Sequence, residues 1–594
     1  MKYNQKEPVL AIILLVMLIN NIAVAAISDL PNEYKLEAKL GLLAVEEEGR
    51  GSVINTTLVL EWGSGEVLAE PRFLVNESVI ISTKVGFYIA SLLAHKNPHS
   101  YDVELYIDTE ETVSGASASG FISATILLLL EGYEVSNKTT MTGMVSSLGF
   151  LLPVAGVKEK ISAAERVGYK QVILPSVLRN TSTEYKNSSI KIRYACNIAE
   201  ASEIIAWNNT IGVNDLDTLT TYLDSYYREV NAEELEPFRA ITQRFLSILD
   251  SIRYNPTDEE LRGRVDKLAR QARSILEEDP YSAASLAFVA LYTASIDISK
   301  KSFKELEDLI GLSLNQSLRI GREAVERAHN YVAVNERCNL PAYFALAAAE
   351  VRLYLAENAA NAEDNETKAL ALLRAISAET WANTAIHASK TTSATISCER
   401  LQTITEFIVN YSELIYNYLK SLQYGREIEI PMPDERKIVE WLKDSKRYLL
   451  DGNYERALGI SLYIIDTIEG ALIVGSGVSE ECIWKHMLEV IEVVDEKAGL
   501  SLPFILISRY TIHEGRFLED VLEDSYQTEF LGVSAITWLL PILVEESVLA
   551  EVNKSAEWSK REINLDLALE VLLLATLIIV GLRFTRYMVL REEV

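Results

Sequence analysis

The spacing of apolar residues divides the chain into a mixed first third and a helical remainder. Alternating apolar and polar positions, as at Val103, Leu105 and Ile107, predict half-buried strands, and apolar residues recurring every three or four positions predict amphipathic helices. The predicted strands are residues 34–45, 52–61, 103–107, 150–154, 171–174 and 190–194. The predicted helices of this part are residues 79–93, 118–130, 157–167 and 199–207. Because strands and helices interleave within a short length, we expect a compact α+β domain over residues 27–210.

Helical periodicity dominates from residue 211 to residue 562. Examples are residues 261–276, 343–355 and 404–422, and the breaks between such segments are short, which indicates antiparallel helix hairpins. Residues 449–458 resemble the middle of a tetratricopeptide repeat, but no period of about 34 residues is sustained. We therefore expect an all-α helical-hairpin domain, built either as a bundle or as a tetratricopeptide-like solenoid.

The N-terminal 26 residues have the layout of a secretory signal peptide. Lys2 and Lys6 precede an apolar run over residues 9–19, and small residues follow at positions 23–26. An uncleaved N-terminal anchor is the alternative. Either interpretation predicts that the chain from Ser28 onward leaves the cytoplasm.

A second apolar segment lies near the C-terminus. Residues 563–583 are long enough to cross a hydrocarbon layer about 30 Å thick, and the arginines at positions 583, 586 and 591 follow or end the segment. Basic residues on this side predict a transmembrane helix whose tail, residues 584–594, stays in the cytoplasm. A buried core helix is the alternative, because Glu570 is costly deep in lipid.

Charge and glycosylation motifs fit an exterior location. Acidic residues outnumber basic ones by 85 to 56, and the net charge of −29 argues against nucleic acid as a partner. Ten Asn-x-Ser/Thr sequons precede the C-terminal apolar segment, as expected of a glycoprotein ectodomain. They begin at Asn55, Asn76, Asn137, Asn180, Asn187, Asn208, Asn315, Asn365, Asn410 and Asn553.

Four cysteines would persist as disulfides in such a location. They are Cys196, Cys338, Cys398 and Cys482, and four cysteines allow three pairings. We favour a bridge between Cys338 and Cys398, because each is predicted to open a helix and the two helices are second neighbours. Unpaired buried thiols remain the alternative.

A serine in a loop of small residues is the first candidate for chemistry. Ser117 lies in the sequence GASASG, residues 115–120, directly before a predicted helix. A serine hydroxyl needs a base to become a nucleophile, and lysine can serve if burial brings its pKa from about 10.4 to near 7. Backbone N–H groups at the start of a helix can stabilise the oxyanion that forms. The alternative reading of such a loop is a tight packing corner.

The sequence downstream supplies the second half of this pattern. Met141, Thr142 and Gly143 are followed by LLPVAGVKEKISAAERVGYKQVILP over residues 151–175. Over residues 35–207 the chain resembles the proteolytic domain of the Lon family of serine–lysine peptidases. The resemblance implies that Ser117 is the nucleophile and that Lys160, the second lysine of a Gly-x-Lys-x-Lys segment, is the base.

Further site residues follow from the same resemblance. Ala116, Ala118 and Gly143 would support the site, and Thr142 would hydrogen-bond Lys160, although ordinary turn chemistry also explains a threonine there. Lys158 is a rival base, but residues two apart on a helix point about 200° apart, so only one lysine can face Ser117.

Several positions depart from the family pattern. Ser114 stands where some relatives carry an acid, Met144 replaces a common glutamate, and Ala155 replaces one of two glycines. Ser119 in place of glycine resembles the archaeal membrane-bound branch of the family. These departures bear on subsite shape and activation rather than on the dyad.

The sequence lacks other catalytic patterns. No GxxxxGK[ST] loop occurs, so no ATP site is expected, and the family's usual ATPase module has no counterpart here. No metal-ligand spacing is present, and the six histidines are too scattered for a Ser/His triad. We expect no cofactor.

These patterns together predict an ATP-independent serine endopeptidase of the cell membrane, single-pass, with its N-terminal ectodomain outside. Its expected substrates are unfolded or flexible polypeptide segments. The alternative is a non-catalytic, membrane-anchored scaffold on a Lon-like fold. Family members form hexameric rings, so homo-oligomerisation is a further expectation, which the helical region would either allow or block.

Overall fold

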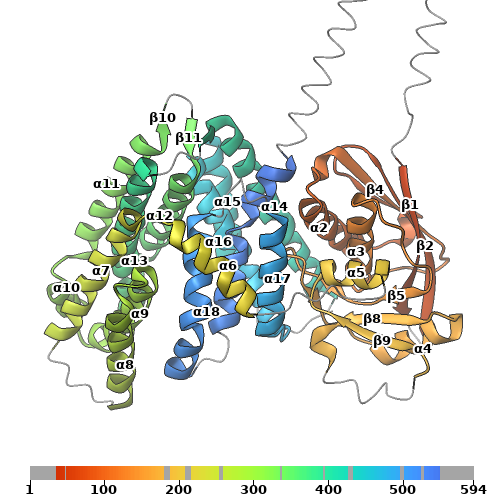
Figure 1. Cartoon of the computed structure of the whole chain (residues 1–594), viewed down its shortest axis with the longest axis horizontal. Coiled ribbons are helices and arrows are strands. Elements are labelled where there is room, and N and C mark those ends of the chain that lie inside the picture. The colour runs from red at the N-terminus through yellow and green to blue at the C-terminus, as the bar shows by residue number, and fades with distance from the viewer. Residues whose placement is uncertain are drawn as a thin grey trace, which may run out of the picture.

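The computed structural model describes most of the two predicted regions but neither end of the chain. The described residues are 35–46, 49–179, 188–207, 216–252, 259–334, 337–391, 395–425, 433–494, 501–523 and 527–548. The predicted signal peptide, transmembrane helix and cytoplasmic tail lie outside these residues. A mixed α/β domain is followed by a mostly helical region, as the periodicity predicts (Figure 1).

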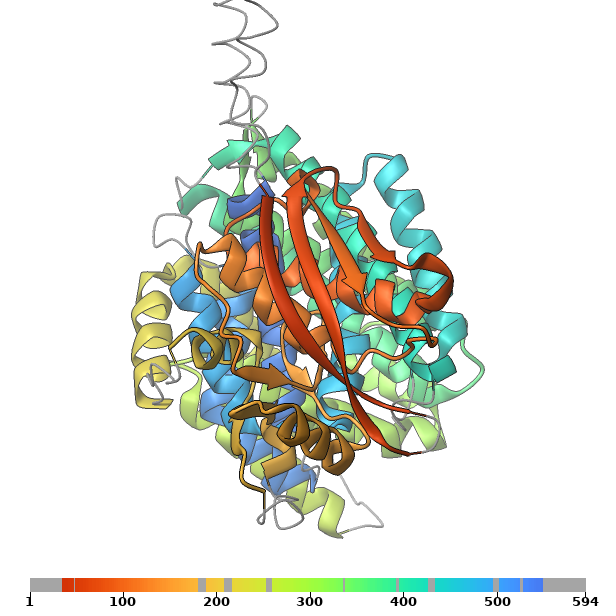
Figure 2. The same cartoon turned by 90° about the vertical axis from the view of Figure 1, so that its right-hand side faces the viewer.

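A four-stranded sheet forms the outer face of the N-terminal domain. Its strands are β1 (Lys35–Val45), β2 (Gly51–Trp62), β3 (Val67–Glu70) and β4 (Tyr101–Ile107), in the order β1-β2-β4-β3. The long antiparallel hairpin of β1 and β2 pairs Lys35 with Glu61 and Val45 with Gly51. Figure 2 shows this hairpin crossing the face of the domain that points away from the helical region.

A second, parallel sheet leads to the candidate site. It contains β5 (Thr139–Met141), β8 (Gln171–Pro175) and β9 (Lys191–Ala195) in the order β5-β8-β9. Between β5 and β8 the chain forms the small hairpin β6 (Met144–Val145) and β7 (Leu151–Leu152), and then a helix.

Four helices complete the described part of the N-terminal domain. They are α2 (Glu77–Leu93), α3 (Ser119–Leu130), α4 (Val157–Val167) and α5 (Ile198–Trp207), and the short 3-10 turns Arg72–Leu74 and Pro98–Ser100 lie before and after α2. Every residue of α3 is buried, which explains its uniformly apolar sequence. Helix α4 is amphipathic and packs on β1 and β2 through a small separate core that includes Leu43, Val157 and Ile161.

The helical region contains fourteen α-helices among its described residues. They are α6 (Leu216–Glu229), α7 (Ala232–Ser251), α8 (Glu259–Ile275), α9 (Pro280–Lys301), α10 (Phe303–Ile310), α11 (Leu314–Val332), α12 (Leu340–Ala359), α13 (Asn365–Thr391), α14 (Cys398–Gly425), α15 (Glu435–Leu450), α16 (Tyr454–Gly475), α17 (Glu480–Val493), α18 (Leu502–Leu522) and α19 (Gln527–Thr537). Sequential pairs such as α12 and α13 pack side by side, as expected of helix hairpins (Figure 1).

Three helices of this region are long and apolar enough to cross a membrane by length and composition. They are Pro280–Lys301, Tyr454–Gly475 and Gln527–Val548. Most residues of each lie inside the helical region, with 61%, 72% and 78% buried respectively. The third contains residues 530–544, which the sequence alone leaves as either a buried or a membrane-surface helix.

The sequence misses the shortest elements. Strands β3, β5 and β6 are not predicted, and the strand expected at 150–154 shortens to Leu151–Leu152. A small antiparallel sheet of β10 (Ala333–Val334), β11 (Arg337–Asn339) and β12 (Thr395–Ser397) interrupts the helical region. Cys338 therefore lies in a strand and does not open a helix, whereas Cys398 begins α14. Two- and three-residue strands are too short to show a period of two.

Candidate active site

Ser117 occupies the turn that leads into α3. The turn begins at Gly115, whose φ of 100° is a left-handed conformation that favours glycine, and its N–H donates to Ser78 Oγ at 3.1 Å. Ala116 is fully buried, while Ser117 and Ala118 are half-buried. The loop thus holds a partly accessible hydroxyl at the N-terminal end of a buried helix, where N–H groups and the helix dipole favour negative charge.

Close backbone approach explains the small residues after the serine. A Cβ on Gly120 would lie 2.8 Å from a Leu151 side-chain carbon and 2.9 Å from the Gly143 carbonyl oxygen. The Gly120 N–H donates to that same carbonyl at 3.0 Å. The segment after β5 therefore packs directly against the start of α3.

Thr142 and Gly143 contact the backbone of Ser117. The Gly143 N–H donates to the Ser117 carbonyl at 2.9 Å, and the Thr142 hydroxyl donates to the same oxygen at 3.3 Å. Thr142 is fully buried, and its own N–H donates to the Ile173 carbonyl in β8. A hydroxyl that donates in this way keeps lone pairs that can accept from an amine.

Lys160 is the buried lysine of α4. It is 4% exposed and is the only lysine that is buried among the described residues, whereas Lys158 on the same helix is exposed. An ammonium group is expensive to bury, by several kcal/mol even after relaxation, so such a lysine needs a reason. Of the two candidate bases that the sequence offers, Lys160 is therefore the buried one and Lys158 the exposed one.

Helix α4 is fixed closely to the start of β2. A Cβ on Gly51 would lie 2.0 Å from the Glu159 carbonyl oxygen and 3.1 Å from the backbone nitrogen of Lys160. The Arg166 guanidinium donates to the Gly51 carbonyl at 2.5 Å. The helix then leads into β8, which pairs with β5, the strand that ends at Met141, directly before Thr142.

The turn between β6 and β7 connects the site to the helical region, a feature that the sequence did not reveal. Ser147 lies in this turn, and its N–H and hydroxyl both donate to Glu469 Oε1 of α16, at 3.1 and 2.7 Å. The Tyr411 hydroxyl of α14 donates to the Ser147 carbonyl at 2.6 Å. Glu469 is fully buried, and burial raises the pKa of its carboxyl although the hydrogen bonds from the turn oppose this.

Other helices hold the residues on both sides of Ser147. The Tyr418 hydroxyl donates to the Val145 carbonyl at 2.8 Å, and a His486 ring nitrogen donates to the Leu148 carbonyl at 2.6 Å. The N–H of Val145 in turn donates to Ser119 Oγ, two residues after Ser117. A continuous set of buried hydrogen bonds therefore joins α14, α16 and α17 to the loop that holds Ser117.

Two disulfides lie in the described part of the chain. Cys338 bonds Cys398, the pairing favoured from sequence, and joins β11 to the start of α14. Cys196 bonds Cys482 of α17 and so links the two regions covalently.

Comparison with known proteins places this geometry in a family. Residues 76–205, which run from the start of α2 to α5, match the model described as the Lon protease (S16) C-terminal proteolytic domain. Residues 76–205 of this chain thus form a Lon-type proteolytic domain.

Curated relatives carry the same assignment. The archaeal Lon protease of Archaeoglobus fulgidus is 33% identical over 144 residues, 22% of each chain. That of Pyrococcus abyssi is 33% identical over 141 residues, 24% of this chain and 12% of the relative, and that of Thermoplasma acidophilum is 28% identical over 163 residues, 27% and 22% respectively. The chain therefore spans less than a quarter of the length of these relatives.

Proposed function

We propose that this chain is a serine endopeptidase in which Ser117 is the nucleophile and Lys160 is the general base. The observation that carries the proposal is the burial of Lys160 within a Lon-type proteolytic domain, two residues from an exposed lysine. A dry environment disfavours the ammonium form and so prepares the amine to accept a proton.

The chemistry requires one proton transfer in each direction. Lys160 takes the proton of the Ser117 hydroxyl as the Ser117 oxygen bonds to the scissile carbonyl carbon. The carbonyl oxygen becomes an oxyanion, which backbone N–H groups of the loop at residues 115–118 stabilise. The tetrahedral intermediate then expels the amine, which receives the proton from Lys160. Water repeats the sequence to release the acyl group from Ser117.

The proposal includes unfolded polypeptide as the substrate and no use of ATP. The sequence carries no phosphate-binding loop, so no nucleotide-driven unfolding is available to the site. Folded proteins should then resist cleavage, while extended segments reach Ser117. We include ATP independence in the proposal for this reason.

We also propose that the two described regions lie outside the cytoplasm and are anchored by the helix predicted over residues 563–583. Two disulfides are typical of an oxidising compartment. Among the sequons in the described part of the chain, Asn55, Asn76, Asn137, Asn315 and Asn410 are exposed, as glycosylation needs.

Hydrolysis of a denatured protein tests the proposal. The full chain should cleave fluorescently labelled, unfolded casein without ATP, and Ser117→Ala and Lys160→Ala should each lower the rate by at least about a thousandfold. Lys158→Ala is the matched control and should retain the rate. Equal rates in the wild type and in both dyad variants would refute the dyad, and inactivity of the wild type would favour the scaffold interpretation.

A further inference from the structure

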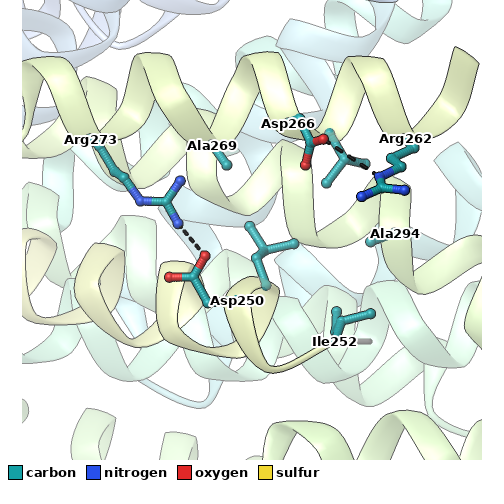
Figure 3. A pocket seen from close by; sticks show the side chains of 9 residues that line it. Asp250, Ile252, Arg262, Asp266, Ala269, Arg273 and Ala294 are labelled. Atoms are coloured by element: carbon teal, nitrogen blue, oxygen red, sulfur yellow. Dashed lines mark hydrogen bonds and ion pairs between the residues drawn. The ribbon is translucent and has the colours of Figure 1, made fainter. Parts of the chain in front are cut away.

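Three hollows among the described residues of the helical region differ in how their charges are balanced. In the one shown in Figure 3, of about 240 Å³, Arg273 pairs with Asp250 at 2.6 Å and Arg262 with Asp266 at 3.8 Å. A second, of about 500 Å³, is lined by Arg509, which pairs with Asp224. In both hollows these arginines pair with carboxylates of the same lining.

The third hollow is a cavity of about 370 Å³ with an aromatic lining. Its walls come from α7, α9, α12, α13, α16, α18 and the helix that begins at Gln527, and they include Phe238, Tyr281, Phe288, Trp381 and Trp538. Apolar walls with a few polar groups are the usual composition of a binding site for a small molecule or a peptide end.

Two guanidinium groups line this cavity without a carboxylate partner. Arg352 of α12 lies over the Trp381 ring, 4.9 Å from its centroid, and donates to the Ala348 carbonyl at 2.8 Å. Neither Arg352 nor Arg374 has a carboxylate within 4.0 Å in the described part of the chain. Both arginines line the same cavity, and burial lowers the pKa of Arg352.

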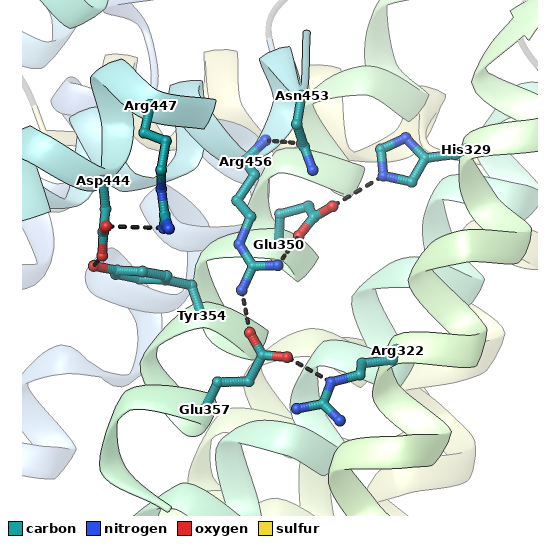
Figure 4. A network of polar contacts seen from close by, with 9 residues as sticks. All are labelled: Arg322, His329, Glu350, Tyr354, Glu357, Asp444, Arg447, Asn453 and Arg456. Carbon is teal, nitrogen blue, oxygen red and sulfur yellow. Dashed lines mark hydrogen bonds and ion pairs between the residues drawn. The ribbon is translucent and has the colours of Figure 1, made fainter. Parts of the chain in front are cut away.

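Other charged side chains of α12 have partners of opposite charge, in contrast to Arg352. In the network of Figure 4, Glu350 bonds His329 at 2.9 Å and Glu357 bonds Arg322 at 2.6 Å, and both carboxylates also pair with Arg456. These acidic and basic groups of α12 and its neighbours are therefore paired with each other. Two neighbouring cations on an apolar cavity are stabilised by an anion that the ligand brings.

The acidic side chain that lines the cavity, Asp466, is compatible with an anionic ligand. Asp466 Oδ1 is buried without a hydrogen-bond partner in the described residues, and burial raises the pKa of this carboxyl to about 7. Burial therefore favours the neutral form of this carboxyl, while guanidinium groups stay protonated. The buried Tyr510 hydroxyl, which also lacks a partner there, is a further group that a ligand can satisfy.

We propose that this cavity binds an apolar molecule that ends in a carboxylate, with Arg352 and Arg374 on the carboxylate and the aromatic walls on the apolar body. Two sources share this chemistry, a fatty acid and the free C-terminus of an apolar peptide. The proposal rests on the cavity alone and does not depend on peptidase activity.

Binding to the full chain with Ser117→Ala separates the two sources and prevents turnover. Calorimetric titrations would use decanoate against decanol, and acetyl-Leu-Phe-Phe with a free carboxylate against its amide. We expect at least one acid to bind at least about tenfold more tightly than its neutral analogue, as a charge-assisted hydrogen bond predicts. The acid that binds identifies the source.

Variants keep the test independent of folding defects. Arg374→Gln should weaken binding of the acid about tenfold and remove its advantage over the neutral analogue, and Ser377→Trp should fill the cavity and abolish binding of both. Arg273→Gln, in the hollow of Figure 3, is the matched control and should leave the affinity unchanged. Failure of both acids to bind, or equal binding of acid and neutral analogue, would overturn the proposal.

Discussion

Lys158 and Lys160 differ in burial, and this difference decides which of them we propose as the base. Both belong to the Gly-x-Lys-x-Lys segment, and helix geometry alone says that only one of them faces inward. The register of α4 on β1 and β2 makes Lys160 the buried one. That register depends on residues far from the segment, such as Gly51, which is why sequence needed a family resemblance to choose between them.

Thr142 is predicted to position the nucleophile. Its hydroxyl donates to the Ser117 carbonyl, so Thr142→Val should leave the fold intact but lower kcat for peptide hydrolysis by about ten- to a hundredfold, with little change in KM. Thr142→Ser keeps the hydroxyl and should recover most of the rate. A valine variant with wild-type kcat would show that the hydroxyl serves only the turn.

Asp466 is predicted to make stability depend on pH. Its folded-state pKa of about 7 lies above the ordinary value of 3.8, so the folded state binds the proton more tightly and stability is lost as pH rises from about 4 to about 7. Asp466→Asn removes this loss and should stabilise the protein by up to about 4 kcal/mol at pH 8.

Urea unfolding of both proteins at pH 8 and pH 4.5 measures this difference. The gain from Asp466→Asn should be small at the lower pH, where the wild-type carboxyl is already protonated in the folded state. An equal gain at both values would mean that the carboxyl does not titrate near neutrality.

At the scale of elements, the length of a helix or strand and the periodicity of its apolar residues decide whether the sequence predicts it. Strand β1 and helix α4 are long and amphipathic, so their patterns predict them correctly. The three-residue strand β5 carries no such pattern, although it places Thr142 beside Ser117. The contact between Ser147 and Glu469 joins residues 322 positions apart, and no local pattern signals it.

We predict that the turn between β6 and β7 depends on the hydrogen bonds that Ser147 donates to Glu469 of α16. Glu469→Ala leaves the Ser147 N–H and hydroxyl without their buried acceptor and should cost about 2–4 kcal/mol of unfolding free energy. It should also lower kcat, because the turn is linked to Ser119 and the serine loop through Val145. Glu469→Gln keeps an acceptor oxygen and should retain more of both.

A surface acid provides the control for this prediction. Glu413 pairs with Lys446 at 2.5 Å, but both side chains are more than 40% exposed, so Glu413→Ala should cost less than about 1 kcal/mol and leave kcat unchanged. If Glu469→Ala and Glu413→Ala unfold at the same urea concentration, the turn does not depend on its anchor.

At the scale of the whole molecule, the proteolytic domain and the helical region form one interlocked unit. Tyr88 of α2 stacks on Tyr411 of α14, and Lys485 pairs with Glu200 at 2.6 Å across the same boundary. The Lon-type part was predictable because its motifs are local. The contacts between the helical region and this part were not predictable, because they come from residues that no motif marks.

The disulfide between Cys196 and Cys482 is predicted to stabilise this boundary. Cys482→Ala should cost about 2–4 kcal/mol of stability and make the two regions separable by limited proteolysis. Peptide mapping without reduction should recover Cys196 joined to Cys482 and Cys338 joined to Cys398. Free thiols at any of these positions in protein isolated under non-reducing conditions would contradict both the pairing and an oxidising location.

The most direct measurement of the central claim is the site of acylation. Incubation of the full chain with an activated peptide ester, followed by acid quench and mass spectrometry, should place the acyl group on the Ser117 hydroxyl, and Lys160→Ala should carry little of it while Lys158→Ala acylates as the wild type does. Peptide cleavage by a wild-type protein whose acyl group lies on another residue, or acylation of Ser117 that does not depend on Lys160, would contradict the account.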